Sequence, residues 1–233
     1  MDFKNKVIII TGGAGALGNA VVMAFLQTGA KVVITFTREA EFNVLKTKAG
    51  APENLLGVKT NVLDEASVKV MAQQVAAFGR IDVLVNLVGG YLGETPIIET
   101  TLEQFDKMIA LNLKSAFLCC KHVLPVMMQQ NAGRIINIGS QGGLQGAEGI
   151  SAYAAAKAGL INFTQSLAAE GKRYHITANA IIPAVIDTPA NRQAMPNADF
   201  SEWVAPEALA RVILFLSSDG AQAITGAAIP VFG

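Results

Sequence analysis

Tyr153 and Lys157 lie four residues apart in the run SAYAAAKAGL, so a helix would present both side chains on one face. A free tyrosine has a pKa of about 10, and proton transfer near neutral pH requires about 4 kcal/mol of preference for the phenolate. A neighbouring ammonium group supplies part of that preference. The pair therefore predicts a general acid or base, although an alanine-rich helix can also carry this spacing by chance.

Ser140 precedes this pair and ends the apolar run RIINIGS. A hydroxyl at the end of a strand can donate to a substrate carbonyl and fix the position of the reacting carbon. A serine after a strand is also ordinary turn chemistry. With Tyr153 and Lys157, it favours a reaction at a carbonyl or an alcohol.

A glycine-rich turn, TGGAGALG, follows the first apolar run of the chain and opens a helix-like stretch. Glycines allow positive φ and close approach of the backbone to a pyrophosphate. The following helix start offers free amides and a favourable dipole. An ordinary strand-to-helix turn is the alternative, but the position after the first strand favours a dinucleotide site. Its candidate residues are Thr11, Gly12, Gly15, Ala16, Leu17 and Gly18.

The residues after the second apolar run should contact the adenosine ribose, and they include Thr37 and Arg38 but no carboxylate. An arginine favours a 2′-phosphate through paired, charge-assisted hydrogen bonds. This pattern favours NADP over NAD. Alternatively, Arg38 simply begins a solvated helix with Glu39 and Glu41.

The elements that must position these residues alternate between short apolar runs and helix-like stretches. Runs with apolar residues on both faces, separated by helices, predict a parallel sheet covered on both sides. We therefore expect an α/β, doubly wound, Rossmann-type fold in one domain over residues 1–233. The expected strands are 6–10, 31–36, 55–60, 81–86, 134–138, 176–182 and 227–232, and the expected helices are 16–28, 65–78, 102–130, 151–170 and 206–217.

Composition narrows the class of partner. Eighteen basic residues balance 18 acidic ones, so no net charge is available to hold nucleic acid or an acidic membrane. We find no leader pattern and no apolar run near membrane-spanning length. We therefore expect a cytoplasmic protein with a small-molecule substrate and no metal site. The adjacent Cys119 and Cys120 are expected to be core residues and not a redox pair.

Taken together, these motifs resemble the single-domain branch of the short-chain dehydrogenase/reductase family over essentially the whole chain. Besides the residues above, the resemblance rests on DVLVN at 82–86, Asn112 in LNLKSAF, and the IIPAVIDTP segment that ends at Pro189. It implies an NAD(P)-dependent oxidoreductase that moves a hydride between nicotinamide and a carbonyl or alcohol. Such an enzyme is expected to be a homo-oligomer, a dimer or a tetramer.

The resemblance also implies roles for individual residues. Tyr153 would be the general acid or base, and Ser140 would orient the substrate. Lys157 would bind the nicotinamide ribose and lower the pKa of Tyr153, while Asn112 would hold a water molecule in a proton relay. The remaining cofactor contacts would come from Asn61 and Val62 beside the adenine, Asn86 at the sheet, and Pro183, Ile186 and Thr188 over the nicotinamide.

Several positions depart from the family pattern. Ala16 stands where the spacing TGxxxGxG requires glycine, and a methyl group there is expected to narrow the phosphate turn. Asn61 replaces the usual acid, Leu87 replaces an asparagine, and Ala184 replaces a glycine. These changes affect cofactor preference and pocket shape and leave the proposed chemistry intact.

The substrate is less constrained by the sequence. The stretches GGAGALG, VGGY and MPNADFSEW resemble dihydropteridine reductases, relatives that lack a serine at the position of Ser140, so reduction of a pterin is an alternative. A dinucleotide-sensing module without turnover is a second alternative. Tyr91 and Gln141 are expected to face the substrate, although either can be a loop residue.

The small and apolar residues of 102–130 and 151–170 predict self-association.

Overall fold

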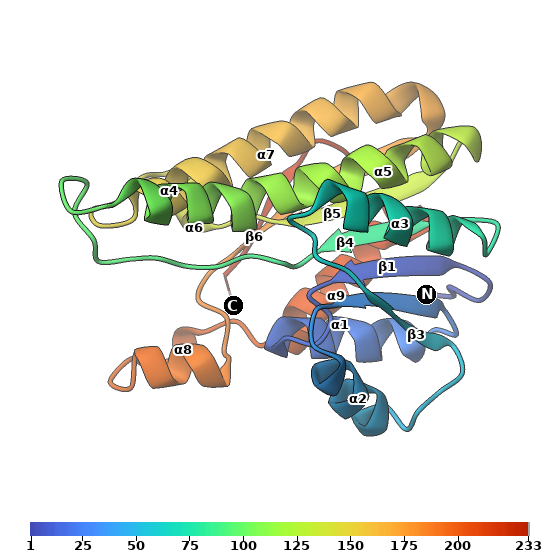
Figure 1. The fold of residues 1–233 in the computed structure, drawn as a ribbon, viewed down its shortest axis with the longest axis horizontal. Helices are drawn as coiled ribbons and strands as arrows, with labels where there is room; N and C mark the ends of the chain where they lie inside the picture. The colour runs from blue at the N-terminus through green and yellow to red at the C-terminus, as the bar shows by residue number, and fades with distance from the viewer. Residues whose placement is uncertain (233) are drawn as a thin grey trace.

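In the computed structural model, residues 1–232 are described and form a seven-stranded parallel sheet (Figure 1). The strand order is β3-β2-β1-β4-β5-β6-β7, so the chain builds outward from β1 to β3 and then returns to the other side of β1. This reversal between β1 and β4 is where a doubly wound sheet binds its ligands. The strands are β1 (Val7–Thr11), β2 (Lys31–Phe36), β3 (Leu55–Lys59), β4 (Val83–Asn86), β5 (Gly133–Ile138), β6 (Ile176–Pro183) and β7 (Ala228–Val231).

Helices cover both faces of this sheet. Alternate side chains of β1 point to opposite faces: Ile8 and Ile10 belong to one core cluster, and Val7 and Ile9 to the other. Helices α3, α5 and α7 lie on one side and α1, α2 and α9 on the other (Figure 1). The helices are α1 (Ala16–Leu26), α2 (Glu39–Lys48), α3 (Glu65–Ala76), α4 (Leu102–Ile109), α5 (Ser115–Gln129), α6 (Gln141–Leu144), α7 (Ser151–Gly171), α8 (Pro189–Ala194) and α9 (Pro206–Ser217).

The predicted fold class is confirmed, and each expected strand is present within two residues of its predicted ends. Helix α2 was not predicted as an element, because it buries only Leu45 and so lacks a strong apolar stripe. Its ends are stabilised instead by acidic residues in the first turn and basic residues in the last. Phe42 also stacks on Phe36 of β2, with 5.2 Å between ring centroids.

The expected helix over 102–130 is divided into α4, a π-helical turn (Ala110–Lys114) and α5. The combined stretch Leu102–Gln129 is long and apolar enough to span a membrane by length and composition, which corrects the expectation that no run approaches that length. Its apolar side chains include Cys119, Val123 and Met127, which pack in the core beside α3 and α7. A core helix of this length passes the same test.

Candidate active site

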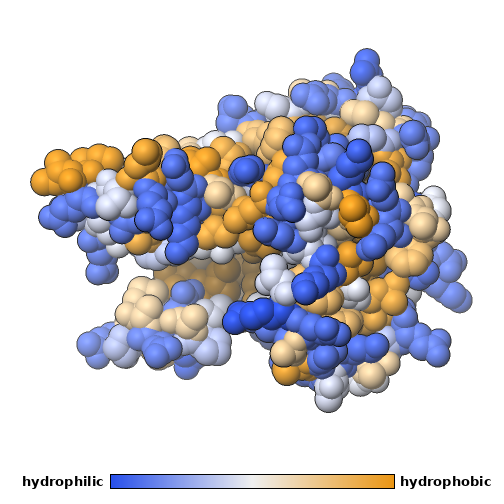
Figure 2. All heavy atoms as spheres, in the orientation of Figure 1, coloured by the Kyte–Doolittle hydropathy of each residue, from blue (hydrophilic) through white to orange (hydrophobic). Residues whose placement is uncertain are grey.

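The candidate site lies where β5 and β6 end, because the segments that follow them, α6 and α8, lie on the same side of the molecule (Figure 1). Figure 2 shows the surface hollowed there, between the α8 segment and the part of the chain that carries α4. Hydrophobic residues form the floor of this hollow. The carboxyl edge of the sheet is therefore open to a ligand of mixed polarity.

Four residues that the sequence singled out come together at this edge. The ammonium nitrogen of Lys157 lies 5.8 Å from the centre of the Tyr153 ring. A methyl group added at Gly142 would lie 3.7 Å from both Ser140 Oγ and Tyr153 Cδ1. One added at Gly89 would lie 2.9 Å from Asn112 Oδ1 and 3.6 Å from Lys157 Nζ. Three separate segments thus bring a phenol, a hydroxyl, an amide and an amine into one small region.

The environment of Tyr153 corrects one expectation about its acidity. Burial raises the pKa of the Tyr153 phenol above its ordinary value, and Tyr91 acts in the same direction, whereas the Ser140 hydroxyl lowers it. A neighbouring ammonium group favours the phenolate, but burial disfavours it and is the largest effect on Tyr153. A raised pKa keeps the phenol protonated at neutral pH, which is the form that donates a proton to a carbonyl oxygen.

Ser140 starts α6 as its N-cap, with its Oγ accepting a hydrogen bond from the Gly142 amide at 3.2 Å. A serine oxygen that accepts in a cap keeps its own hydrogen for a further acceptor. Gln141, the other candidate next to it, is exposed at the start of the same helix. The short helix therefore fixes the Ser140 hydroxyl beside Tyr153.

Lys157 is 6% exposed and donates from Nζ to the carbonyl oxygen of Ile138 at 2.6 Å. Burial lowers the pKa of this amine to about 8, since the charged form loses most of its contact with water. The amine is therefore still protonated at neutral pH. Its hydrogen bond joins α7 to the end of β5.

The lowered pKa of Lys157 predicts how stability depends on pH. Between about pH 8 and pH 10.5 the folded protein has lost this proton while the unfolded chain retains it. The free energy of unfolding of the wild type, relative to Lys157→Met, should therefore rise with pH in this window by up to about 1.4 kcal/mol per pH unit. Denaturant unfolding of both proteins measures this difference. A difference in unfolding free energy that does not change with pH would contradict this prediction. Lys172→Met, which removes an exposed lysine, serves as the control.

Asn112 is 1% exposed and lies in the π-helical turn between α4 and α5. Its Oδ1 accepts from the Gly90 amide at 3.1 Å, and its Nδ2 donates to the carbonyl oxygens of Gly90 and Met108, both at 3.0 Å. The water-holding role that the resemblance implies stays a prediction, and the bonds seen here are to backbone groups. Asn112 therefore fixes the loop that follows β4.

The glycine turn after β1 is wound too tightly for a side chain at Gly12 or Gly18. Gly12 has φ +68°, and a Cβ at Gly18 would lie 2.3 Å from the Gly12 carbonyl oxygen. Ala16, where the family pattern requires glycine, is the exposed first residue of α1. Among the described residues, no side chain caps the start of α1. The Gly15 amide donates to the Gly12 carbonyl oxygen at 3.0 Å, and the first amides of α1 remain for an anionic ligand such as the pyrophosphate of a dinucleotide.

Thr11 and Asn86 pair across β1 and β4, where the strand order reverses. Thr11 Oγ1 accepts from the Leu87 amide at 3.1 Å. Asn86 donates to Asn137 Oδ1 at 2.9 Å, and Asn137 donates to Thr164 Oγ1, also at 2.9 Å. Within residues 1–232 the buried Oδ1 of Asn86 has no hydrogen-bond partner. An amide chain thus connects β4, β5 and α7 beneath the site.

The candidate adenosine contacts follow β2 and β3. Thr37 and Arg38 come directly before α2, as the alternative interpretation of Arg38 expected, and Arg38 forms an ion pair with Glu41. The Arg38 side chain is 77% exposed, so this pair is weak and can yield to another anion. Asn61 Oδ1 accepts from the Leu63 amide at 3.1 Å. Val62 packs into the core, which leaves mainly its backbone for a ligand.

The segment from β6 to α9 covers the hollow from the other side. Pro183 ends β6, Ile186 forms a bridge with Val204, and Thr188 caps α8. Two backbone hydrogen bonds close the base of this segment, from Asp187 to Val204 at 2.9 Å and from Val204 to Val185 at 2.8 Å. Residues 186–204 are therefore a short flap with a fixed base.

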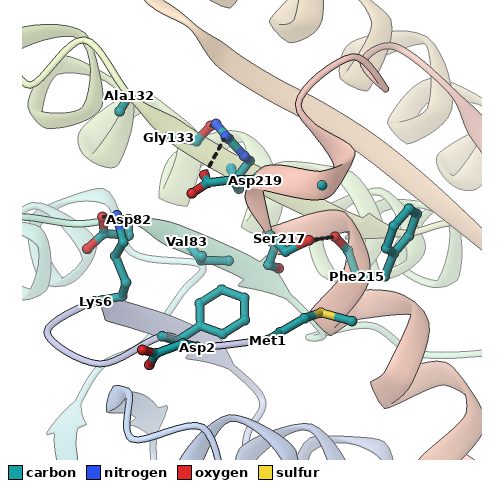
Figure 3. Close-up of a pocket in the computed structure, with 14 residues that line it drawn as sticks. Met1, Asp2, Lys6, Asp82, Val83, Ala132, Gly133, Phe215, Ser217 and Asp219 are labelled. Atoms are coloured by element: carbon teal, nitrogen blue, oxygen red, sulfur yellow. Dashed lines mark hydrogen bonds and ion pairs between the residues drawn. The ribbon is translucent and has the colours of Figure 1, made fainter.

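A second cavity, of about 450 Å³, lies at the opposite edge of the sheet (Figure 3). Lys6 and Asp82 precede β1 and β4 on one side of it, and Ser217 and Asp219 lie on the other. Asp82 accepts from the Val7 amide at 2.9 Å and from Arg80 Nε at 2.7 Å, so its charge is already neutralised. This cavity lies at the amino ends of the strands, away from the candidate catalytic residues.

Four glycines that were not among the predicted site residues also shape the site, namely Gly13, Gly89, Gly142 and Gly143. A Cβ at Gly13 would lie 2.7 Å from Ile34 Cγ2, and one at Gly143 would lie 2.8 Å from the backbone of Lys157. Their positions in the sequence could have predicted this role, because each glycine follows a strand at the carboxyl edge of the sheet. They allow the strand ends, α1 and α7 to approach closely.

Comparison with known proteins gives a consistent result. The family model described as short chain dehydrogenase matches residues 6–199. The 3-oxoacyl-[acyl-carrier-protein] reductase FabG of Thermotoga maritima is 34% identical, covering 100% of this chain and 98% of the relative. The cis-4-hydroxycyclohexanecarboxylate dehydrogenase of Sinomonas cyclohexanicum is also 34% identical, covering 99% and 96%. The solved structure of ElxO with NADP bound has a TM-score of 0.89 at 29% identity, covering 97% and 96%.

Proposed function

Because this chain belongs to the short-chain dehydrogenase family, we propose that it is an NADP-preferring carbonyl reductase with Tyr153 as its general acid. It is an NAD(P)-dependent oxidoreductase that acts on a small molecule. The observation that carries the finer proposal is the grouping of Tyr153, Ser140 and Lys157 beside the glycine turn. The whole chain acts as one cofactor-binding and catalytic domain.

The carboxyl edge of the sheet would hold the cofactor. The amides of the turn Thr11–Gly18 would bind its pyrophosphate, and Arg38, now paired with Glu41, would bind the 2′-phosphate of NADP. The backbone of Asn61 and Val62 flanks the adenine. Lys157 and the flap residues Pro183, Ile186 and Thr188 would contact the nicotinamide half, while Asn86, bonded to Asn137, supports the sheet beneath it.

The reaction needs a hydride, a proton and a fixed carbonyl group. When bound, the reduced nicotinamide supplies a hydride to the carbonyl carbon. Ser140 donates a hydrogen bond to the carbonyl oxygen, which lowers the cost of the developing negative charge. Tyr153 then donates its proton to that oxygen, and the product is the alcohol. The Lys157 ammonium, 5.8 Å from the ring, stabilises the phenolate that remains.

The cofactor preference provides the first test. Arg38→Gln should raise the Kd for NADPH about 10- to 100-fold, because a charge-assisted pair contributes about 1.5–3 kcal/mol. The Kd for NADH should change less than about threefold, since NADH has no 2′-phosphate. Fluorescence titration measures both constants, and cofactor oxidation with a panel of ketones, acyl thioesters and quinonoid pterins tests turnover. Arg211→Gln, on an exposed arginine of α9, should leave both Kd values unchanged.

Two results would count against the proposal. Equal loss of NADPH and NADH affinity in Arg38→Gln would remove the NADP preference. Absence of turnover with every carbonyl on the panel, while cofactor still binds, would remove the reductase assignment. Relatives named as a reductase and a dehydrogenase support turnover over a sensing role.

Membership of the short-chain dehydrogenase family also supports self-association into a dimer or tetramer. An apolar groove of about 380 Å³ lies between α5 and α7. Phe117, 43% exposed, lies 5.9 Å from Phe163 between ring centroids in this groove, beside Leu124 and Pro125. We assign a second copy of this chain to the groove, because an exposed apolar face of this kind is typical of a subunit interface.

A further inference from the structure

We propose that Tyr91 is a specificity-determining residue, which forms an aromatic wall beside Tyr153 and favours ring-bearing ketones over open-chain ketones. The inference rests on the proposed carbonyl reductase function. It concerns the substrate side of the site and does not depend on which nicotinamide cofactor binds.

The two tyrosine rings are in direct contact. Their centroids are 5.1 Å apart and their planes meet at 80°, which is the edge-to-face arrangement that aromatic rings prefer. Tyr91 is 67% exposed, so most of its surface remains available to a ligand. A substrate whose carbonyl oxygen reaches the Tyr153 hydroxyl therefore lies beside the Tyr91 ring.

The backbone on both sides of Tyr91 is fixed to the rest of the site. Gly90 exchanges two hydrogen bonds with the buried side chain of Asn112. The Thr95 amide donates to the Gly149 carbonyl oxygen at 3.1 Å, in the loop that leads into α7. Gly149 has φ +76°, and a Cβ there would lie 2.9 Å from Glu94 Cα. The loop is thus held between the Asn112 turn and the helix that carries Tyr153.

Gly93 leaves free the space that the Tyr91 ring occupies. A Cβ at Gly93 would lie 2.1 Å from Tyr91 Oη and 2.3 Å from Cζ. Any larger residue at position 93 must therefore displace the Tyr91 ring. The present orientation requires glycine at this position, which makes Gly93 a means of moving the ring without removing it.

A flat and fixed aromatic surface discriminates between substrates by shape. A rigid ring can lie against it without losing internal rotations, whereas a flexible chain must give up several. Hydrophobic residues form the floor of the hollow beside this surface (Figure 2). The class of ligand that fits best is therefore a cyclic or aryl ketone.

The test compares acetophenone with 2-octanone, two methyl ketones of equal carbon number that differ in having a ring or a chain. With saturating NADPH, Tyr91→Ala should lower the ratio of their kcat/KM values about 2- to 10-fold, the range of one aromatic contact. Tyr91→Phe should keep the ratio of the wild type. Gly93→Ala should reproduce the loss, and the double variant Tyr91→Ala, Gly93→Ala should lose no more than Tyr91→Ala alone.

A second measurement separates this role from a general loss of fold. Tyr91 raises the pKa of the Tyr153 phenol, so Tyr91→Ala should shift the alkaline limb of kcat/KM to lower pH. The Kd for NADPH should remain unchanged in each variant that folds. If Gly93→Ala does not fold, the Tyr91→Ala and Tyr91→Phe pair still decides the question.

An unchanged ratio in Tyr91→Ala, with turnover intact, would overturn the specificity role and leave the proposed function standing. A wild type that prefers 2-octanone would also overturn it. A wild type that binds NADPH and reduces no carbonyl compound would instead overturn the proposed function, and this inference with it.

Discussion

Tyr153→Phe should lower kcat by about 10²- to 10⁴-fold, the usual contribution of a positioned general acid. The substitution removes one hydroxyl and keeps the ring, so the edge-to-face contact with Tyr91 remains. The Kd for NADPH should therefore change little, because Tyr153 acts mainly on the substrate. Steady-state kinetics with the best ketone of the panel, together with cofactor titration, measures both quantities.

Tyr174→Phe provides the matched control for that result. Tyr174 follows α7 in a short 3-10 turn, with Arg173 stacked over its ring at 4.8 Å, at the end of α7 remote from Tyr153. Removing its hydroxyl should leave kcat unchanged. Turnover of Tyr153→Phe at the rate of this control would show that another group donates the proton, and the assignment of Tyr153 would be wrong.

Gly18→Ala should destabilise the fold by about 1–3 kcal/mol and lower the affinity for NADPH at least about 100-fold. The added methyl group would lie 2.3 Å from the Gly12 carbonyl oxygen and 2.7 Å from Gly13, both of which are backbone. Backbone cannot move aside as a flexible side chain can, so the turn must open. Thermal unfolding and NADPH titration measure the two effects.

Gly15→Ala makes the same chemical change three residues earlier and serves as the control. Its φ is −73°, and the nearest atom to an added Cβ is the Gly12 carbonyl oxygen at 3.4 Å. This is ordinary contact, so stability should stay close to the wild type, and affinity should fall much less than in Gly18→Ala. Equal NADPH affinity in Gly18→Ala and Gly15→Ala would contradict the role assigned to the turn.

The sheet could be predicted from the sequence because its strands are buried on both faces. Each strand therefore appears as an uninterrupted apolar run, as KVVITF does for β2. Helix α2 has no such signal, since charged ends and a single buried leucine hold it in place. Helix α8 buries none of its residues and so has no apolar stripe, and it depends on the Thr188 cap and on polar contacts such as that of Arg192 with Asp187.

Residue types and spacing could predict the members of the candidate site but not all of their bonds. The hydrogen bonds of Asn112 to Gly90 and of Lys157 to Ile138 depend on loop and helix positions that no local pattern encodes. The direction of the Tyr153 pKa shift was reversed for a related reason. Charges are visible in a sequence, whereas the depth of burial is a property of the whole fold.

Because hydrogen bonds join the two ends of the 186–204 flap, its length and sequence can be changed without disturbing the rest of the fold. The chain enters and leaves the flap through adjacent residues that are already bonded, at Asp187 and Val204. A longer or shorter insert between these two anchor points leaves β6 and α9 in register. Grafting a different insert there should redesign the size of the entrance, while the proton-transfer groups on the opposite wall keep their arrangement.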